Sequence, residues 1–93
     1  MSIKITITRN AQIDIKNLFS FIKDVNGVAA ARAKRKEIYD TIKYLNTFPQ
    51  MGPISQEYKN VPGEIRYLVC SPFRIFYQIT EKTIYIFRIA DTR

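Results

Sequence analysis

The segment Phe73–Ile79 reads FRIFYQI and decides the fold of this chain. Runs rich in β-branched and aromatic residues flank it, Ile65–Cys70 before it and Thr83–Ala90 after it. Only short separators, Ser71–Pro72 and Glu81–Lys82, stand between the runs, so we expect three consecutive strands joined as antiparallel hairpins. Because side chains alternate between the two faces of a strand, one face of the middle strand should carry Phe73, Ile75, Tyr77 and Ile79, and the other Arg74, Phe76 and Gln78.

Upstream of these strands, the sequence predicts a short strand and a first helix. The segment Ile3–Thr8 alternates strictly between apolar and polar residues, which is typical of a half-buried strand. Thr8 or Asn10 can cap the following helix, and Gly27 suits the left-handed position after its end. The apolar stripe of this helix consists of Ala11, Ile15, Leu18, Ile22 and Val25.

A second helical pattern runs from Val28 to about Asn46, and Pro49, Gly52 and Pro53 prevent its continuation. We expect residues 47–63 to form a loop with room for one helical turn. The predicted class is α+β, in the order β-α-α-β-β-β, with a helical hairpin packed on a small, mainly antiparallel sheet. At 93 residues, we expect a single domain over 1–93. The apolar face of the second helix consists of Ala31, Ile38, Ile42 and Leu45.

The composition argues against most enzyme classes. The chain has no histidine and a single cysteine, Cys70, so histidine-dependent catalysis, the usual zinc sites and an internal disulfide are excluded. Its three glycines are dispersed, so no glycine-rich phosphate loop is present. We expect no metal and no cofactor. No segment is apolar enough to span a membrane and no secretory signal is visible, so we expect a cytoplasmic protein without a membrane partner.

Fifteen Lys and Arg against eight Asp and Glu give a net charge of +7 and a pI near 9.8. Such a balance is typical of proteins that bind nucleic acid, acidic proteins or anionic surfaces. The densest basic cluster is Arg32, Lys34, Arg35 and Lys36, which equally fits a solvated helix face. Charge alone therefore does not choose between these partners.

The arginines of the predicted sheet are the strongest candidate site residues. Arg66, Arg74 and Arg93 lie in or just after adjacent strands, where they either bind a partner or simply face water. Beside Arg74 we expect Phe76, Phe87 and Leu68, so that the uncovered face combines cations with large apolar groups, as binding surfaces do. For Arg88 we favour a structural role under the helices, in a salt bridge to one of three acidic residues, Asp14, Asp24 or Asp40.

Taken together, these segments resemble the RelE/ParE superfamily of bacterial toxins of type II toxin–antitoxin systems. The resemblance is carried by Ala11, Asp14 and Ile15 in the first helix, by the spacing of Ile38, Ile42, Leu45, Pro49 and Gly52, and by IRYL at 65–68, FRIFYQI at 73–79, IYIFRI at 84–89 and Thr92–Arg93. It implies the same β-α-α-β-β-β fold and one of two activities. RelE-like members cut mRNA on the ribosome, whereas ParE-like members inhibit DNA gyrase and are not nucleases.

The resemblance implies that Arg74 and Arg93, and more loosely Lys59 and Arg66, would be the catalytic residues of a RelE-like enzyme. Arginine transfers protons poorly because its pKa exceeds 12, and we expect Tyr67 and Tyr77 to lie on the face opposite Arg74. The spacing from Pro49 to Gly52 is also closer to ParE. We therefore predict a ParE-like gyrase inhibitor neutralised by a cognate antitoxin. On this interpretation, the residues that bind the target or the antitoxin are Arg66, Arg74, Phe76, Phe87 and Arg93.

Two alternatives stay open at this point. The first is a RelE-like endonuclease that acts on the ribosome and its mRNA, and the second is a basic module that binds nucleic acid through its phosphates.

Overall fold

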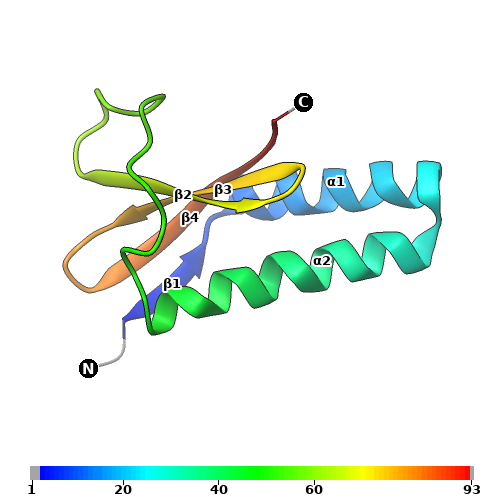
Figure 1. Cartoon of the computed structure of the whole chain (residues 1–93), viewed down its shortest axis with the longest axis horizontal. Coiled ribbons are helices and arrows are strands. Elements are labelled where there is room, and N and C mark those ends of the chain that lie inside the picture. Colours follow the sequence, from blue (N-terminus) through cyan, green and yellow to red (C-terminus); the bar gives the residue numbers. More distant parts are fainter. Residues whose placement is uncertain (1–2, 93) are drawn as a thin grey trace.

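A computed structural model describes residues 3–92 and has the predicted order of elements (Figure 1). Strand β1 precedes two helices, and a three-residue 3-10 helix, Tyr44–Asn46, tightens the chain at the end of the second helix. The second helix is therefore shorter than its predicted extent to Asn46. The elements are β1 (Lys4–Ile7), α1 (Arg9–Asn26), α2 (Val28–Lys43), β2 (Glu64–Cys70), β3 (Phe73–Ile79) and β4 (Thr83–Asp91).

The two helices form a hairpin that turns at a single residue. Of the two predicted caps, Thr8 is the one used: its Oγ1 accepts a hydrogen bond from the backbone N–H of Ala11 at 3.3 Å, whereas Asn10 lies inside α1. Gly27 closes α1 by donating its N–H to the carbonyl of Lys23 at 2.9 Å, and its φ of +94° favours glycine. The backbone thus reverses direction between Asn26 and Val28.

The four strands form one mixed sheet in the order β1-β4-β3-β2. The β2–β3 and β3–β4 pairs are antiparallel, as predicted, and β1 adds to the far edge parallel to β4. In the β2–β3 register, Tyr67 lies opposite Phe76 and Val69 opposite Arg74, so these four side chains share one face. Tyr67 therefore lies on the same face as Arg74, and the opposite prediction for Tyr67 was wrong.

A β-bulge in β4 changes which residues face the helices. Phe76 pairs with Arg88 but Tyr77 pairs with Ile86, so Phe87 is an extra residue in the ladder. Strict alternation from Ile86 would place Arg88 against the helices; the bulge instead buries Ile89 and leaves Arg88 exposed on the other face. The predicted salt bridge of Arg88 under the helices is thus wrong, and Asp14 instead accepts a hydrogen bond from the backbone N–H of Ile89 at 2.9 Å.

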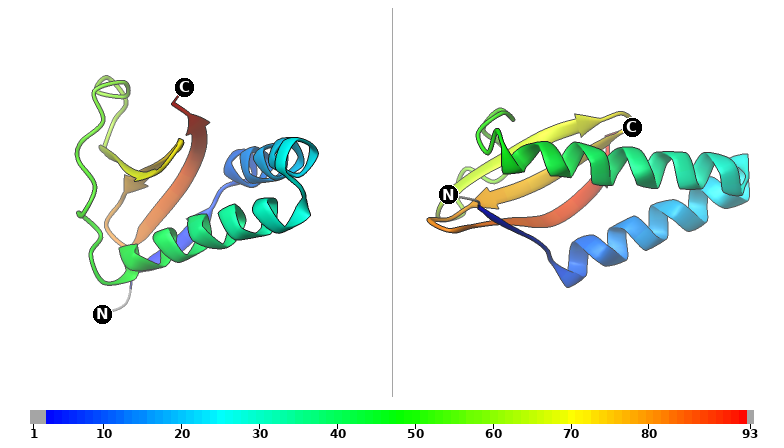
Figure 2. Two further views of the ribbon diagram at one scale, coloured as in Figure 1. Left: turned by 45° about the vertical axis from the view of Figure 1, so that its right-hand side comes forward. Right: turned by 90° about the horizontal axis from the view of Figure 1, so that it is seen from below.

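The core lies between the helical hairpin and one face of the sheet (Figure 2). Most of the predicted apolar stripes are buried, but the tip of the hairpin extends beyond the sheet in Figure 1, which leaves Val25 62% exposed. Leu68, predicted beside Arg74, is buried in this core. No helix of the described residues is long and apolar enough to cross a membrane. The buried cluster comprises Ala11, Ile15, Leu18, Ile38, Ile42, Leu45, Leu68, Cys70, Phe73, Ile75, Tyr77, Ile84, Ile86 and Ile89.

The long loop 47–63 is fastened to the sheet over its middle part. The backbone N–H of Gly52 donates to the buried Tyr77 hydroxyl at 3.1 Å, and Arg66 donates to the Gly52 carbonyl at 2.6 Å. The Pro53 carbonyl accepts from the N–H of Tyr67, and the Ser55 N–H donates to the carbonyl of Ile65. These bonds cover part of the β2 edge, which would otherwise expose unpaired backbone groups.

Candidate functional site

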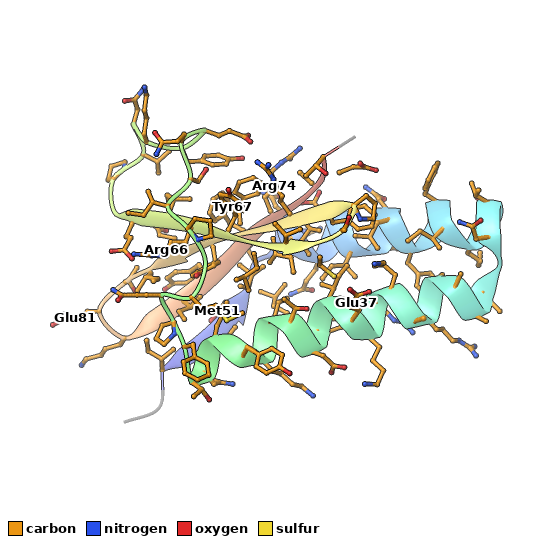
Figure 3. All side chains as sticks on the ribbon, in the orientation of Figure 1. Glu37, Met51, Arg66, Tyr67, Arg74 and Glu81 are labelled. Atoms are coloured by element: carbon orange, nitrogen blue, oxygen red, sulfur yellow. The ribbon has the colours of Figure 1, made fainter. Side chains whose placement is uncertain are left out.

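The sheet face turned away from the helices carries the candidate site, and we call it the open face. Figure 3 shows Arg74 and Tyr67 on this side, whereas Glu37 of α2 lies on the other. Strand geometry fixes the positions of these residues: β2 and β3 send alternate side chains to this side, and the bulge in β4 places both Phe87 and Arg88 on it. Its members are Tyr67 and Val69 from β2, Arg74 and Phe76 from β3, and Phe87 and Arg88 from β4.

Arg74 is held in place by two neighbours. Its guanidinium carbon lies 4.8 Å from the centre of the Tyr67 ring, in a cation–π contact. One of its nitrogens lies 3.7 Å from a carboxylate oxygen of Glu57 in the long loop. The side chain of Arg74 remains 39% exposed. Arg74 is thus a positioned cation that a ligand can reach.

An aromatic cluster lies next to Arg74. Tyr58, from the long loop, meets Phe76 with ring centres 5.1 Å apart and Phe87 with ring centres 5.2 Å apart. The interplanar angles of 65° and 90° make both contacts edge-to-face, which is a favoured aromatic geometry. Because Tyr58 covers it, Phe76 is only 2% exposed, contrary to the expectation that it is available to a partner. Phe87 is half-buried.

A polar pocket of about 380 Å³ opens beside this cluster. Two arginines from adjacent strands, Arg74 and Arg88, border it, together with the Glu57 carboxylate. Guanidinium groups form paired hydrogen bonds with carboxylates and phosphates, so the two arginines can bind an anionic group in a pocket that also holds the carboxylates of Glu57 and Asp91. Its lining is completed by Phe76, Ala90, Asp91 and Thr92.

The other predicted site residues do not join Arg74. Arg66 lies on the helix side of the sheet, where it pairs with Glu64 and donates hydrogen bonds to the carbonyls of Gln50 and Gly52 in the long loop. Lys59 is exposed and borders a different pocket, beside Tyr58 and Ile65. Tyr77 lies in the core, opposite Arg74 as predicted, and burial raises the pKa of its hydroxyl. Arg93 lies outside the described residues.

Two further observations concern metal-dependent and cysteine-dependent chemistry within residues 3–92. Among residues 3–92, no cluster of three or more His, Cys, Asp or Glu side chains is placed to hold a metal ion. Cys70 is buried at the end of β2, and burial raises the pKa of its thiol, which disfavours the reactive thiolate.

Sequence reasoning missed Glu57 and Tyr58, the two loop residues that contact the open face. They lie in a segment without periodicity, and their position depends on how the loop crosses the sheet. Arg88 was also misplaced, because nothing in IYIFRI marks the extra residue of the bulge. A glutamate next to a tyrosine in a loop is too common a pair to indicate a site.

The fold and the charge first define a class: a basic β-α-α-β-β-β domain with the architecture of RelE/ParE toxins. The family described as "ParE toxin of type II toxin-antitoxin system, parDE" matches residues 5–93, and the chain belongs to this family. It is 28% identical over 86 residues to the protein named "Toxin ParE3" of Caulobacter vibrioides, covering 92% of this chain and 83% of that protein. The predicted resemblance, closer to ParE than to RelE, is confirmed.

A solved structure supports the same architecture. The structure described as "Chromosomal ParDE TA system from P. aeruginosa" superposes with a TM-score of 0.82 at 24% identity, covering 98% of this chain and 97% of that one. At this identity the likeness establishes the fold. The predicted α+β class and its order of elements are therefore confirmed.

Proposed function

We propose that this ParE-family toxin inhibits DNA gyrase in the cytoplasm and is neutralised by a cognate antitoxin. Membership of the ParE family supports a toxin role, and the P. aeruginosa relative is described as part of a ParDE system. An inhibitor that acts by binding requires an exposed surface of cations and apolar groups rather than a set of catalytic side chains. The open face provides such a surface.

One observation carries the choice of gyrase over mRNA cleavage: the three candidate catalytic cations within residues 3–92 lie in different parts of the molecule. Arg74 faces the polar pocket, Lys59 borders another pocket, and Arg66 lies on the helix side of the sheet. Cleavage of RNA through its 2′-hydroxyl requires a base and an acid at the same phosphate. With a guanidinium as the main group present, proton transfer would be slow, whereas binding needs no proton transfer.

The net charge of +7 supports an acidic protein partner for the toxin. Complementary charge speeds encounter between proteins and disfavours wrong partners. Co-expression with the adjacent small open reading frame should therefore yield a complex that survives high salt, because apolar anchors persist when charges are screened. Recovery of a harmless, unpartnered protein would contradict the toxin–antitoxin proposal.

The decisive experiment compares two readouts for the same purified protein. We expect the protein to stop ATP-dependent supercoiling by purified gyrase and to leave ribosome-bound mRNA intact. The double variant Arg74→Ala with Arg88→Ala should require about tenfold more protein for the same inhibition, as expected for positions worth more than about 1 kcal/mol in an interface. The variant Arg32→Ala removes an exposed cation of α2 away from the open face and serves as the matched control.

Two other results would replace the proposal. Codon-phased mRNA cuts that vanish in Arg74→Ala, with supercoiling unchanged, would favour the RelE-like endonuclease. Binding to DNA alone, with an affinity that falls steeply as salt rises and no effect on gyrase, would favour the basic nucleic-acid-binding module.

A further inference from the structure

The loop segment 56–61, which we call the strap, crosses the open face with little backbone support. Before it, Pro53 and Ser55 bond to the backbone of β2, and after it the Gln78 side chain donates to the carbonyl of Pro62 at 3.1 Å. Between these anchors, within the described residues, the backbone of the strap makes no hydrogen bond to the sheet; Val61 donates only to Tyr58 within the strap itself. The strap can therefore leave the sheet while both anchors remain.

Two neighbouring side chains hold the strap against the open face. Tyr58 rests on Phe76 and Phe87, which together we call the aromatic seat. Glu57 reaches Arg74 at 3.7 Å and is 64% exposed, so this ion pair is long and well solvated. Removing Tyr58 would uncover Phe76, which is otherwise buried. The contact is thus easily broken, and breaking it uncovers apolar surface.

The side chains of the strap indicate which chemical groups a ligand of this site would carry. One residue supplies an aromatic ring, and the residue before it supplies a carboxylate directed to Arg74. The adjoining pocket, with Arg74 and Arg88 on its border, has room for a further anionic group. A ligand that matches this site would carry a ring and a carboxylate at neighbouring positions.

We propose that Tyr58 is a displaceable plug, and that a protein partner inserts its own aromatic side chain into the aromatic seat while an adjacent carboxylate pairs with Arg74 and Arg88. The inference rests on the proposed function in taking the partner to be a protein. What it adds is that the contact segment of this partner carries an aromatic side chain next to a carboxylate. The net charge of +7 favours an acidic segment over a neutral one.

A nucleotide also combines an aromatic ring with an anion, but the geometry favours a side chain. Tyr58 meets both phenylalanines edge-on, at 65° and 90°, and the two phenylalanine rings are themselves tilted by 40°. Nucleobases bind proteins mainly by stacking face to face on an aromatic ring. A seat without parallel faces therefore suits a phenyl or phenol ring better.

The plug makes binding competitive. Because the strap is tethered at both ends, its effective concentration at the seat is high. The apparent affinity of a partner is its affinity for the open seat multiplied by the fraction of molecules in which the seat is free. Removing the plug should therefore tighten binding by about tenfold if the seat is open in about one molecule in ten.

The test measures binding of a fluorescein-labelled synthetic peptide with the chain's own sequence at 54–62, ISQEYKNVP, by fluorescence anisotropy. We expect Tyr58→Ala to bind this peptide about tenfold more tightly than the parent, and Arg74→Gln in that background to reverse most of the gain. The peptide with its tyrosine replaced by alanine should bind neither protein. Tyr39→Ala removes a partly exposed tyrosine of α2, on the helix side of the sheet, and it should match the parent.

A second variant keeps the test decisive if Tyr58→Ala unfolds. Glu57→Gln frees the Arg74 end of the strap and should tighten binding about threefold, whereas the charge-matched control Glu81→Gln, in the β3–β4 turn, should not change it. Equal affinity of Tyr58→Ala and the parent, both with parental circular dichroism, would overturn the proposal. A labelled RNA oligonucleotide that gains more than the peptide would also overturn it, in favour of a nucleotide. The binding assay contains no gyrase. A protein that failed to inhibit gyrase could therefore still confirm or overturn the plug proposal in this assay.

Discussion

The fastening of the long loop at Gly52 provides a quantitative prediction for the variant Gly52→Ala. The φ angle of Gly52 is not in the left-handed region, so the cost of alanine comes from space. A methyl group here would collide with the backbone carbonyl of Tyr67 and lie 3.0 Å from the Tyr77 hydroxyl. Because the first neighbour is backbone within a sheet, it cannot turn aside as a flexible side chain would. The loop must therefore move away from β2.

That movement has a cost that follows from the bonds it breaks. Overpacking costs about 1–3 kcal/mol, and leaving the buried Tyr77 hydroxyl or the Gly52 N–H without a partner costs about another 1–3 kcal/mol. Gly52→Ala should therefore destabilise the protein by about 2–6 kcal/mol, out of a total of about 5–15 kcal/mol. Tyr77→Phe removes only the hydrogen bond and should cost about 1–3 kcal/mol.

Urea unfolding followed by circular dichroism measures these differences, and the double variant tests the mechanism. Once Gly52→Ala has broken the bond, adding Tyr77→Phe should cost much less than it does alone. The control Tyr85→Phe removes a partly exposed hydroxyl and should change stability by less than about 0.5 kcal/mol. An unchanged midpoint for Gly52→Ala, or strictly additive effects, would refute the reasoning.

Three further predictions concern the core and its edges. Ile38→Asp should unfold the protein, because an unpaired charge in the core costs several kcal/mol, and a parental melting curve would show that the assigned core face of α2 is wrong. The hydrogen bond from Lys34 lowers the pKa of Glu37 below its usual 4.5. The stability that the charged Glu37 contributes is therefore complete above pH 4.5 and is lost as pH falls through the lowered pKa. Glu37→Gln should reduce the loss of stability in acid by less than about 1 kcal/mol, since the pair is exposed. Cys70 should react with Ellman's reagent only as fast as the protein unfolds, and rapid labelling of the folded protein would contradict its burial.

The regular elements could be predicted because local periodicity determines them. The stripe through Ala11, Ile15 and Leu18 is buried as expected, and so are Ile38 and Ile42 on α2. Each of these positions is specified by a repeat of three or four residues, which a reader of the sequence can count. The strand boundaries likewise agree with the predicted ones to within one residue, and β3 matches at both ends.

The candidate site was only partly predictable, because two of its features depend on long-range geometry. The bulge at Phe87 moves Arg88 to the open face, and alternation alone gives the opposite answer. The loop brings Glu57 to Arg74 and Tyr58 to Phe76, although 17 and 18 positions of the sequence separate these pairs. It also engages Arg66 through a hydrogen bond to the Gly52 carbonyl. Arg74 was placed correctly, since its face follows from the alternation within FRIFYQI.

The parallel pairing of β1 with β4 determines when the sheet can be completed during synthesis of the chain. Lys4–Ile7 is synthesised before both helices, whereas its partner in the sheet, Thr83–Ile86, is synthesised only after β2 and β3. The helical hairpin depends on local contacts and can form early, whereas this strand pairing must close a loop that contains both helices, β2 and β3. An interrupted chain therefore lacks both the outer strand pair and the Phe87–Arg88 part of the open face. A chain that terminates before β4 should therefore be an inactive fragment.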